Sequence, residues 1–114
     1  MAITDVLRVT AESLEDAIII RATGEIDMGT VDLLRRELDG AREQGGSVLL
    51  DLSAVTFIDS TGLRLLLQAS QMSAHSDWGF FLVRPSVAVQ RLIQISGTAD
   101  LITVVDTGAE RIHG

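Results

Sequence analysis

The sequence predicts an α/β domain with a mostly parallel β-sheet, an antiparallel N-terminal edge strand and helices packed against the sheet. Two observations carry this prediction. Segments with the apolar pattern of strands alternate along the chain with segments of helical periodicity. Strands and helices in alternation are joined by right-handed crossovers, which make neighbouring strands parallel. A length of 114 residues is ordinary for one domain, so we expect the range 1–114 to form a single unit.

The first two predicted strands form a hairpin. One strand spans 6–11 and the other spans 17–25, with the short polar turn 12–16 between them. The second strand contains three consecutive isoleucines at 18–20, and such a β-branched run favours a strand that is covered at least partly on both faces. The first strand is therefore expected at the antiparallel edge of the sheet.

The rest of the chain alternates between helix and strand. The range 30–44 has apolar residues along one helical face, and Gly45 and Gly46 end this helix in the expected way. The expected apolar face consists of Val31, Leu34, Leu38 and Ala41. The elements expected after it are a buried strand at 47–52, a helix at 60–76, a strand at 80–83, a helix from 85–86 to about 95, a strand at 102–105 and one terminal turn of helix.

The composition excludes several kinds of chemistry. The chain has no cysteine, which removes disulfide scaffolds, zinc–cysteine sites, iron–sulfur clusters and thiol nucleophiles. All nine basic residues are arginine, and without lysine neither Schiff-base chemistry nor a P-loop is available. His75 and His113 have no partner at metal-ligand spacing. We therefore expect no metal and no cofactor, and we expect Met72 and Trp78 to be packing residues.

The charge and hydropathy patterns bear on partners and location. A net charge of -7 opposes nucleic-acid binding, which relies on clustered cations. The chain has no apolar run of about 18 residues, and its first five residues do not resemble a signal peptide. We expect a cytoplasmic protein that binds no nucleic acid, does not insert into membranes, and is a monomer or weak dimer.

The most informative segment is Asp59-Ser60-Thr61-Gly62, between a buried strand and a helix. In open α/β sheets, sites lie beyond the carboxyl ends of the strands. Ser60 would begin the helix, where unpaired N–H groups and the helix dipole favour an added anion such as a phosphate. The alternative is purely structural, because Asp, Ser and Thr are preferred N-cap residues and Gly62 would allow tight packing.

A second polar cluster, Gly24-Glu25-Ile26-Asp27, ends the second predicted strand. If the two strands are neighbours, Asp27 lies at the same edge of the sheet as Ser60, where its carboxylate could orient the serine hydroxyl. Capping of the following helix by Asp27 or Thr30 is the alternative interpretation.

Three segments of this chain resemble the STAS domain of bacterial anti-sigma factor antagonists. They are GEID at 24–27, LLDLSAVTFIDSTGL at 49–63 and VRPSVAVQRLIQISG at 83–97. The resemblance covers nearly the whole chain in the right order and spacing. It implies a single STAS-like domain and a switch protein that is not an enzyme.

The resemblance also implies a mechanism. The second of these segments ends in the motif DSTGL at 59–63. In that family, the serine that follows the Asp of this motif is phosphorylated by an anti-sigma factor that is also a serine kinase using ATP. This serine corresponds to Ser60, with Thr61 as a secondary acceptor and with Asp27, Asp59 and Gly62 around the phosphosite. The unphosphorylated protein binds the anti-sigma factor and frees a sigma factor, phosphorylation ends this binding, and a serine phosphatase resets the switch.

Arg64 departs from the family pattern, in which a small residue is common at this position. At an exposed helix start, its guanidinium could pair with a phosphate or favour a particular partner. A solvated helix side chain is the alternative interpretation.

Other functions remain open on the sequence. The chain could be a STAS module of another assembly, such as a stressosome component or a cytoplasmic partner of a lipid transporter. It could also be a nucleotide-binding STAS domain that uses the loop ends around Asp27 and Ser60. A hydrolase triad is excluded if the predicted helix forms, because its rise puts His75 about 20 Å from Ser60.

Overall fold

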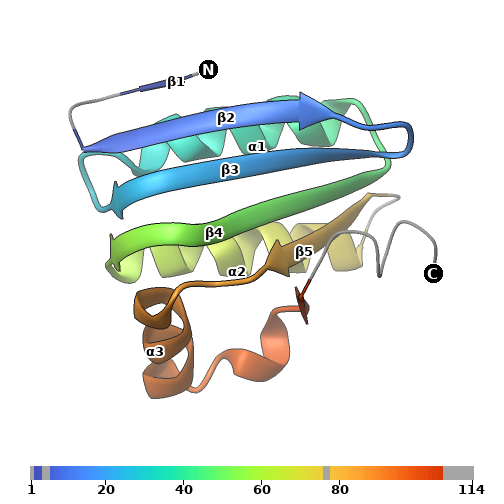
Figure 1. Ribbon diagram of the computed structural model, residues 1–114. Coiled ribbons are helices and arrows are strands. Elements are labelled where there is room, and N and C mark those ends of the chain that lie inside the picture. Colours follow the sequence, from blue (N-terminus) through green and yellow to red (C-terminus); the bar gives the residue numbers. More distant parts are fainter. Residues whose placement is uncertain (1, 4–5, 76–77, 107–114) are drawn as a thin grey trace.

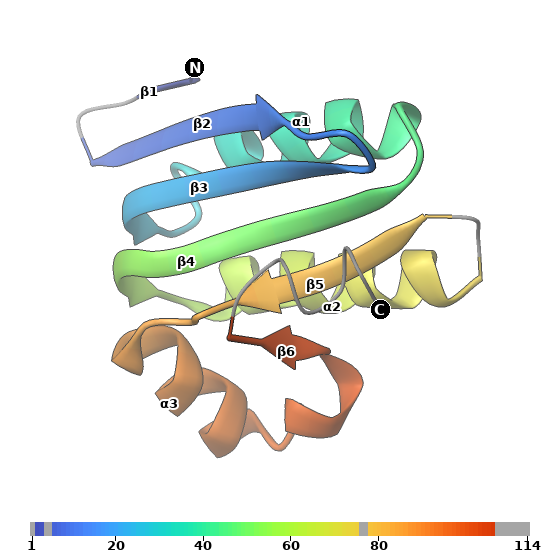
Figure 2. The ribbon, with the colours of Figure 1, turned by 45° about the vertical axis from the view of Figure 1, so that its right-hand side comes forward.

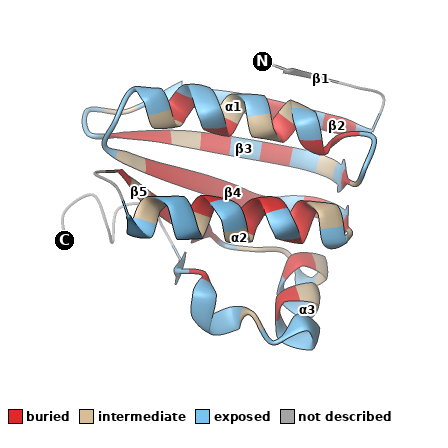
Figure 3. Ribbon diagram, turned by 180° about the vertical axis from the view of Figure 1, so that it is seen from behind, coloured by how far each residue is buried: buried red, intermediate tan, exposed pale blue. Residues whose placement is uncertain are grey.

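The computed structural model describes residues 2–3, 6–75 and 78–106, which fold around one β-sheet (Figure 1). The strands are β1 (Ala2–Ile3), β2 (Leu7–Ser13), β3 (Ala17–Ile26), β4 (Ser47–Ile58), β5 (Gly79–Val83) and β6 (Val104–Val105). The helices are α1 (Val31–Glu43), α2 (Ser60–Ala74), α3 (Val87–Ser96) and a 3₁₀ turn at Ala99–Leu101. Helices α1 and α2 lie side by side across one face of the sheet (Figure 3).

The strands lie in the sheet in chain order, from β1 to β6. Strand β2 is antiparallel to both of its neighbours, whereas β3, β4, β5 and β6 are parallel. Helix α3 and strand β6 lie on the β5 side of the sheet (Figure 2). The predicted α/β class with a mostly parallel sheet is confirmed. One detail is corrected: the short strand β1 pairs outside β2, so the predicted first strand is not the outermost one.

The β2–β3 hairpin forms as predicted. The Leu14 N–H donates to the Ala17 carbonyl over 2.7 Å and closes the turn. Ser13 lies opposite Ile18 in the register. Across the hairpin, Arg21 forms an exposed ion pair with Glu12 at 3.0 Å. The first strand extends two residues beyond its predicted end, because the turn is tighter than the polar composition of 12–16 suggests.

Strand β4 is longer than expected and reaches Ile58 instead of ending at Leu52. Its pairing with β3 continues to the Ile26–Ile58 position, through two register shifts. Gly24 lies within this irregular stretch with φ of 115°, and a Cβ there would come within 2.1 Å of the Val6 carbonyl oxygen. A glycine is therefore required where β3 bends closely past the start of β2.

The core lies mainly between the sheet and helices α1 and α2. All four residues of the predicted apolar face of the first helix are buried. A second, smaller apolar cluster is formed by strand residues that alternate with those of this main core. It consists of Ala17, Leu49, Val83 and Val105. This packing places the carboxyl ends of β3 and β4 beside the start of α2.

The C-terminal third follows the predicted order with smaller elements. Helix α3 begins with Ser86 as its N-cap and ends at Gly97, which has φ of 73°. The last predicted strand is reduced to two residues, because the 3₁₀ turn precedes it. The terminal helical turn expected after Asp106 lies outside the described residues. In the part of the chain that the structure describes, no helix is long and apolar enough to cross a membrane.

Candidate functional site

Asp59 caps the start of α2, directly after β4. Its Oδ1 atom accepts hydrogen bonds from the Thr61 N–H at 2.9 Å and the Gly62 N–H at 3.3 Å, and it also accepts one from the Thr61 hydroxyl. These contacts satisfy N–H groups that a helix start otherwise leaves unpaired. The Thr61 hydroxyl is the main cause that lowers the pKa of Asp59; burial opposes the shift, and the backbone N–H groups of Gly62, Thr61 and Met28 reinforce it. Asp59 is therefore a fixed negative charge at neutral pH.

Asp59 also ties the loop between β3 and α1 to the start of α2. Its own N–H donates to the Ile26 carbonyl at 3.1 Å, and the Met28 N–H donates to its carboxylate. The expectation that the ends of the two strands lie at one edge is thereby confirmed. We call this part of the molecule, residues 26–28 and 57–62, the Ser60 edge.

Asp27 belongs to the Ser60 edge but is bonded within its own loop. Its Oδ1 accepts from the Gly29 N–H at 2.9 Å, and its N–H donates to the hydroxyl of the buried Thr30, also at 2.9 Å. The Thr30 hydroxyl in turn donates to the Glu25 carbonyl at 2.9 Å. Among the described residues, no hydrogen bond joins Asp27 to Ser60. Asp27 thus shapes the turn before α1. The alternative of helix capping is not observed at these described positions, because Thr30 is the N-cap of α1 but makes no side-chain capping hydrogen bond, and the Asp27 carboxylate bonds Gly29 before the helix begins.

Ser60 is the first residue of α2, and its side chain is exposed. Within the described residues, its hydroxyl makes no hydrogen bond. The neighbouring Thr61 differs, because its side chain is half-buried and its hydroxyl is held by Asp59. The two adjacent hydroxyls are therefore unequal, since only that of Ser60 is both exposed and unbonded. The sequence alone did not distinguish them in this way.

Gly62 lets α2 start close to the sheet. A Cβ at this position would come within 2.7 Å of Ile58 Cγ1 and 2.8 Å of Ile26 Cγ2, which is closer than side-chain atoms pack. The structural interpretation of Gly62 is therefore supported. Arg64 lies one turn further along α2 with an exposed side chain, and in the described part of the chain nothing pairs with it.

Two large apolar side chains are exposed at the Ser60 edge. Met28 is 78% exposed and Phe57 is 47% exposed, and they flank the loop and the strand end that meet at Asp59. Neither exposure was predicted from the sequence. The predicted strand ends at residue 52, whereas the alternation that turns Phe57 outward and Ile58 inward belongs to the part of β4 beyond that residue.

A charged pair that is not predictable from the sequence pattern joins β4 to the end of β5. Asp51 is only 7% exposed; it accepts from the Ser53 N–H at 2.9 Å and pairs with Arg84 Nη2 at 3.1 Å. Burial is the largest influence on the pKa of Asp51 and would raise it, but the Ser53 and Arg84 contacts together outweigh burial and lower the pKa. This pair lies within the sheet and supports the fold.

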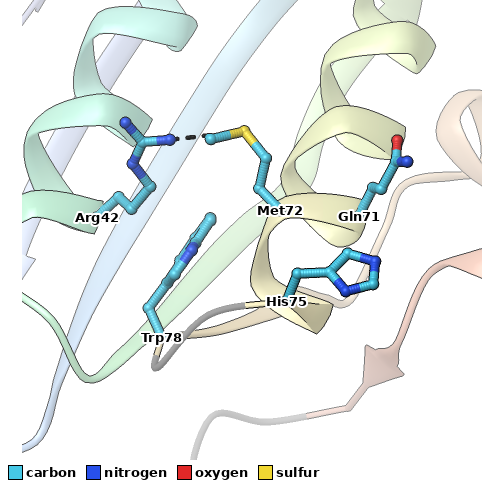
Figure 4. A pocket seen from close by; sticks show the side chains of 5 residues that line it. All are labelled: Arg42, Gln71, Met72, His75 and Trp78. Carbon is cyan, nitrogen blue, oxygen red and sulfur yellow. Dashed lines mark hydrogen bonds between the residues drawn. The ribbon is translucent and has the colours of Figure 1, made fainter.

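A hollow of about 620 Å³ lies at the opposite end of α2, lined by Arg42, Gln71, Met72, His75 and Trp78 (Figure 4). Trp78 is buried and packs edge-to-face on Phe80 with ring centroids 6.2 Å apart, as expected of a packing residue. Met72 is 43% exposed and accepts a hydrogen bond from Arg42 at 3.5 Å, so it lines the hollow and is not a core residue. The described residues contain no group of three potential metal ligands.

Fold and site together define a small α/β domain whose distinguishing feature is an exposed serine at a helix start, beside two strand ends. The chain belongs to the STAS domain family, whose model matches residues 8–110. It is 30% identical over 98 residues to the anti-sigma-B factor antagonist of Bacillus subtilis strain 168, covering 86% of this chain and 90% of that protein.

Solved structures share this fold. An anti-sigma factor antagonist from Mycobacterium paratuberculosis matches with a TM-score of 0.82 at 24% identity, over 99% of this chain and 97% of that one. The anti-sigma factor antagonist SpoIIAA in its unphosphorylated form matches with a TM-score of 0.70 at 26% identity, over 92% and 93%. The Bacillus SpoIIAA in its phosphorylated form matches with a TM-score of 0.66 at 24% identity, over 93% and 97%.

Proposed function

We propose that this protein is an anti-sigma factor antagonist that is switched by phosphorylation at Ser60. The unphosphorylated form binds a cognate anti-sigma factor with serine kinase activity and so frees a sigma factor in the cytoplasm. Phosphorylation weakens this binding, and a serine phosphatase restores it. The observation that carries the proposal is the exposed, unbonded Ser60 hydroxyl at the start of α2. The names of the relatives and the two states of SpoIIAA support it.

The geometry favours Ser60 over Thr61 as the phosphate acceptor. A kinase must bring a free hydroxyl into line with the γ-phosphate of ATP. The Thr61 hydroxyl donates a hydrogen bond to the N-cap residue Asp59. Phosphorylation of Thr61 would therefore break a contact at the start of the helix. A phosphate on Ser60 would instead lie at the positive end of the α2 dipole, which stabilises an adjacent anion by about 0.3–1 kcal/mol.

The switch acts through charge at an interface. Phosphorylation adds a charge of nearly -2 beside Asp59 and Asp27, which are already negative. At an effective dielectric constant near 20, one pair of like charges about 6 Å apart repels by roughly 3 kcal/mol. Each 1.4 kcal/mol changes an affinity about tenfold. An acidic or desolvated partner surface is therefore rejected about a hundredfold without any refolding.

The exposed apolar side chains at the Ser60 edge supply the attractive part of this interface. Met28 and Phe57 lie next to the charge that changes, and exposed apolar groups beside a polar site are typical of protein-binding surfaces. Burial of these two side chains against the anti-sigma factor would bring the partner directly over Ser60. Phosphate and partner then compete for the same surface.

The proposal is tested by incubating the purified protein with candidate anti-sigma serine kinases and ATP, followed by mass spectrometry. We expect one phosphate on Ser60, none on Ser60→Ala, and an unchanged result for Thr61→Val. Modification at a different residue, or by none of the kinases, would contradict the proposal and favour a STAS module of another assembly.

A further inference from the structure

Arg64 is placed to reach a group attached to Ser60. The two residues are four apart on α2, where side chains are surface neighbours with Cβ atoms about 5–6 Å apart. Both side chains are exposed. Because the Cα–Cβ bonds of a helix tilt toward its N-terminus, a long side chain at position 64 can reach over the turn that begins with Ser60.

Arg64 also has no competing partner in the described part of the chain. Other arginines are engaged: Arg21 pairs with Glu12, Arg35 with Asp32, and Arg84 with Asp51. The two carboxylates of the Ser60 edge, those of Asp59 and Asp27, accept hydrogen bonds within their own turns. In the unphosphorylated protein, the Arg64 guanidinium therefore has no anionic partner among the described residues, and a phosphate on Ser60 would supply one.

We propose that Arg64 is a positioning residue that clamps the phosphate on Ser60 by an ion pair within α2. This inference rests on the proposed phosphorylation of Ser60. An acidic group that precedes a basic one by four residues has the favourable orientation on a helix, because both charges then agree with the helix dipole. A guanidinium also presents two parallel N–H donors to two phosphate oxygens.

The phosphate and Arg64 would have different effects at the phosphosite. The phosphate adds negative charge to the Ser60 edge, while Arg64 holds it in one orientation against the helix. The same contact withdraws Arg64 from solvent and from any partner that the unphosphorylated form binds. Phosphorylation thus changes two charges at this surface in a single step.

The test is a ³¹P NMR titration of the full chain with phosphoserine placed at position 60 during translation, so that no kinase is needed. We compare the original sequence with Arg64→Ala, Arg64→Lys and the control Arg36→Ala, an exposed arginine on α1. An exposed pair of this type changes the phosphate pKa by about 0.3 units. We expect Arg64→Ala to raise the pKa by this amount, Arg64→Lys to raise it less, and Arg36→Ala to leave it unchanged. The difference should shrink at high salt.

Equal titration midpoints for the original sequence and Arg64→Ala, or an equal shift for Arg36→Ala, would overturn the clamp. Because the phosphoserine is introduced without a kinase, this failure is distinct from a failure of the proposed function. The proposed function fails only if the candidate kinases do not modify Ser60. Far-UV circular dichroism of each variant checks that α2 is retained.

Discussion

At the scale of single residues, one aspartate sets the properties of the Ser60 edge. Asp59 holds the Thr61 hydroxyl, accepts from N–H groups of the first turn of α2, and binds the Met28 N–H of the neighbouring loop. Ser60 lies between these contacts and takes part in none of them among the described residues. The Ser60 side chain is thereby exposed between two residues whose backbone N–H groups are both hydrogen-bonded.

Some of these residues could be predicted from the sequence and others could not. The run Asp59-Ser60-Thr61-Gly62 has the composition of a helix start, and the structure confirms its position. The unequal states of Ser60 and Thr61 depend on which hydroxyl faces Asp59, and composition carries no information about that. Asp51 and Arg84 are 33 residues apart in the chain, so their pairing follows only from the parallel register of β4 and β5.

The lowered pKa of the buried Asp51 predicts how the free energy of unfolding depends on pH. Its folded-state pKa is lowered below the ordinary value of 3.8, so its contribution is present above that value and is lost as the pH falls through the folded-state pKa. Asp51→Asn should reduce the free energy of unfolding at pH 7 by about 1–2 kcal/mol, because charged hydrogen bonds are lost. The difference between the two proteins should shrink as the pH falls below 3.8 and through the folded-state pKa.

Urea unfolding at pH 7 and pH 3 measures this effect. Asp39→Asn is the matched control, since Asp39 is exposed on α1. A constant difference between the original protein and Asp51→Asn across this range would contradict the assigned role of Asp51.

At the scale of elements, the packing of α2 against the sheet places the Ser60 edge. The helix begins directly above Ile26 and Ile58, the last residues of β3 and β4, and Gly62 makes this approach possible. The elements with strong periodicity were predictable, as the buried face of α1 illustrates. The second half of β4 was not, because Ser53 and Ala54 interrupt the apolar pattern and the pairing with β3 continues across register shifts.

Two glycine substitutions with opposite expected effects test this packing. Gly62→Ala places a Cβ against Ile58 and Ile26 and should cost about 1–3 kcal/mol. Gly40 lies within α1, and a Cβ there would meet nothing within 4 Å. Gly40→Ala should therefore stabilise the protein by about 0.5–1 kcal/mol.

Thermal and urea unfolding of the two variants give the comparison. A destabilised Gly40→Ala would indicate that α1 is not helical at this position. A neutral Gly62→Ala would contradict the close approach of α2 to the strand ends.

At the scale of the whole molecule, the sheet brings segments far apart in the sequence to one edge. Met28 precedes α1, Phe57 is the second-last residue of β4 and Ser60 begins α2, yet all three belong to the Ser60 edge. The order of the strands was predictable from the alternation of helix and strand. The exposure of Met28 was not, because a single methionine in a loop carries no periodic signal.

Alanine substitutions separate docking from folding at this surface. Met28→Ala and Phe57→Ala should each weaken binding of the anti-sigma factor about tenfold, because an exposed apolar anchor contributes more than 1 kcal/mol when an interface buries it. The unfolding free energy should change little. Leu101→Ala is the control, since Leu101 is 64% exposed on the 3₁₀ turn beside β6.

Calorimetric titration with the purified anti-sigma factor measures these affinities. Equal weakening by Leu101→Ala would show that the binding surface is not the Ser60 edge. Unaltered affinity for both Met28→Ala and Phe57→Ala would contradict the proposed docking surface.

The central claim is that one phosphate on Ser60 changes the affinity of an otherwise unchanged fold. The most direct measurement is the dissociation constant of the anti-sigma factor for one preparation of the protein, before and after stoichiometric phosphorylation at Ser60. Charge repulsion of about 3 kcal/mol predicts binding that is about a hundredfold weaker after phosphorylation. Equal dissociation constants for the two forms would contradict the account.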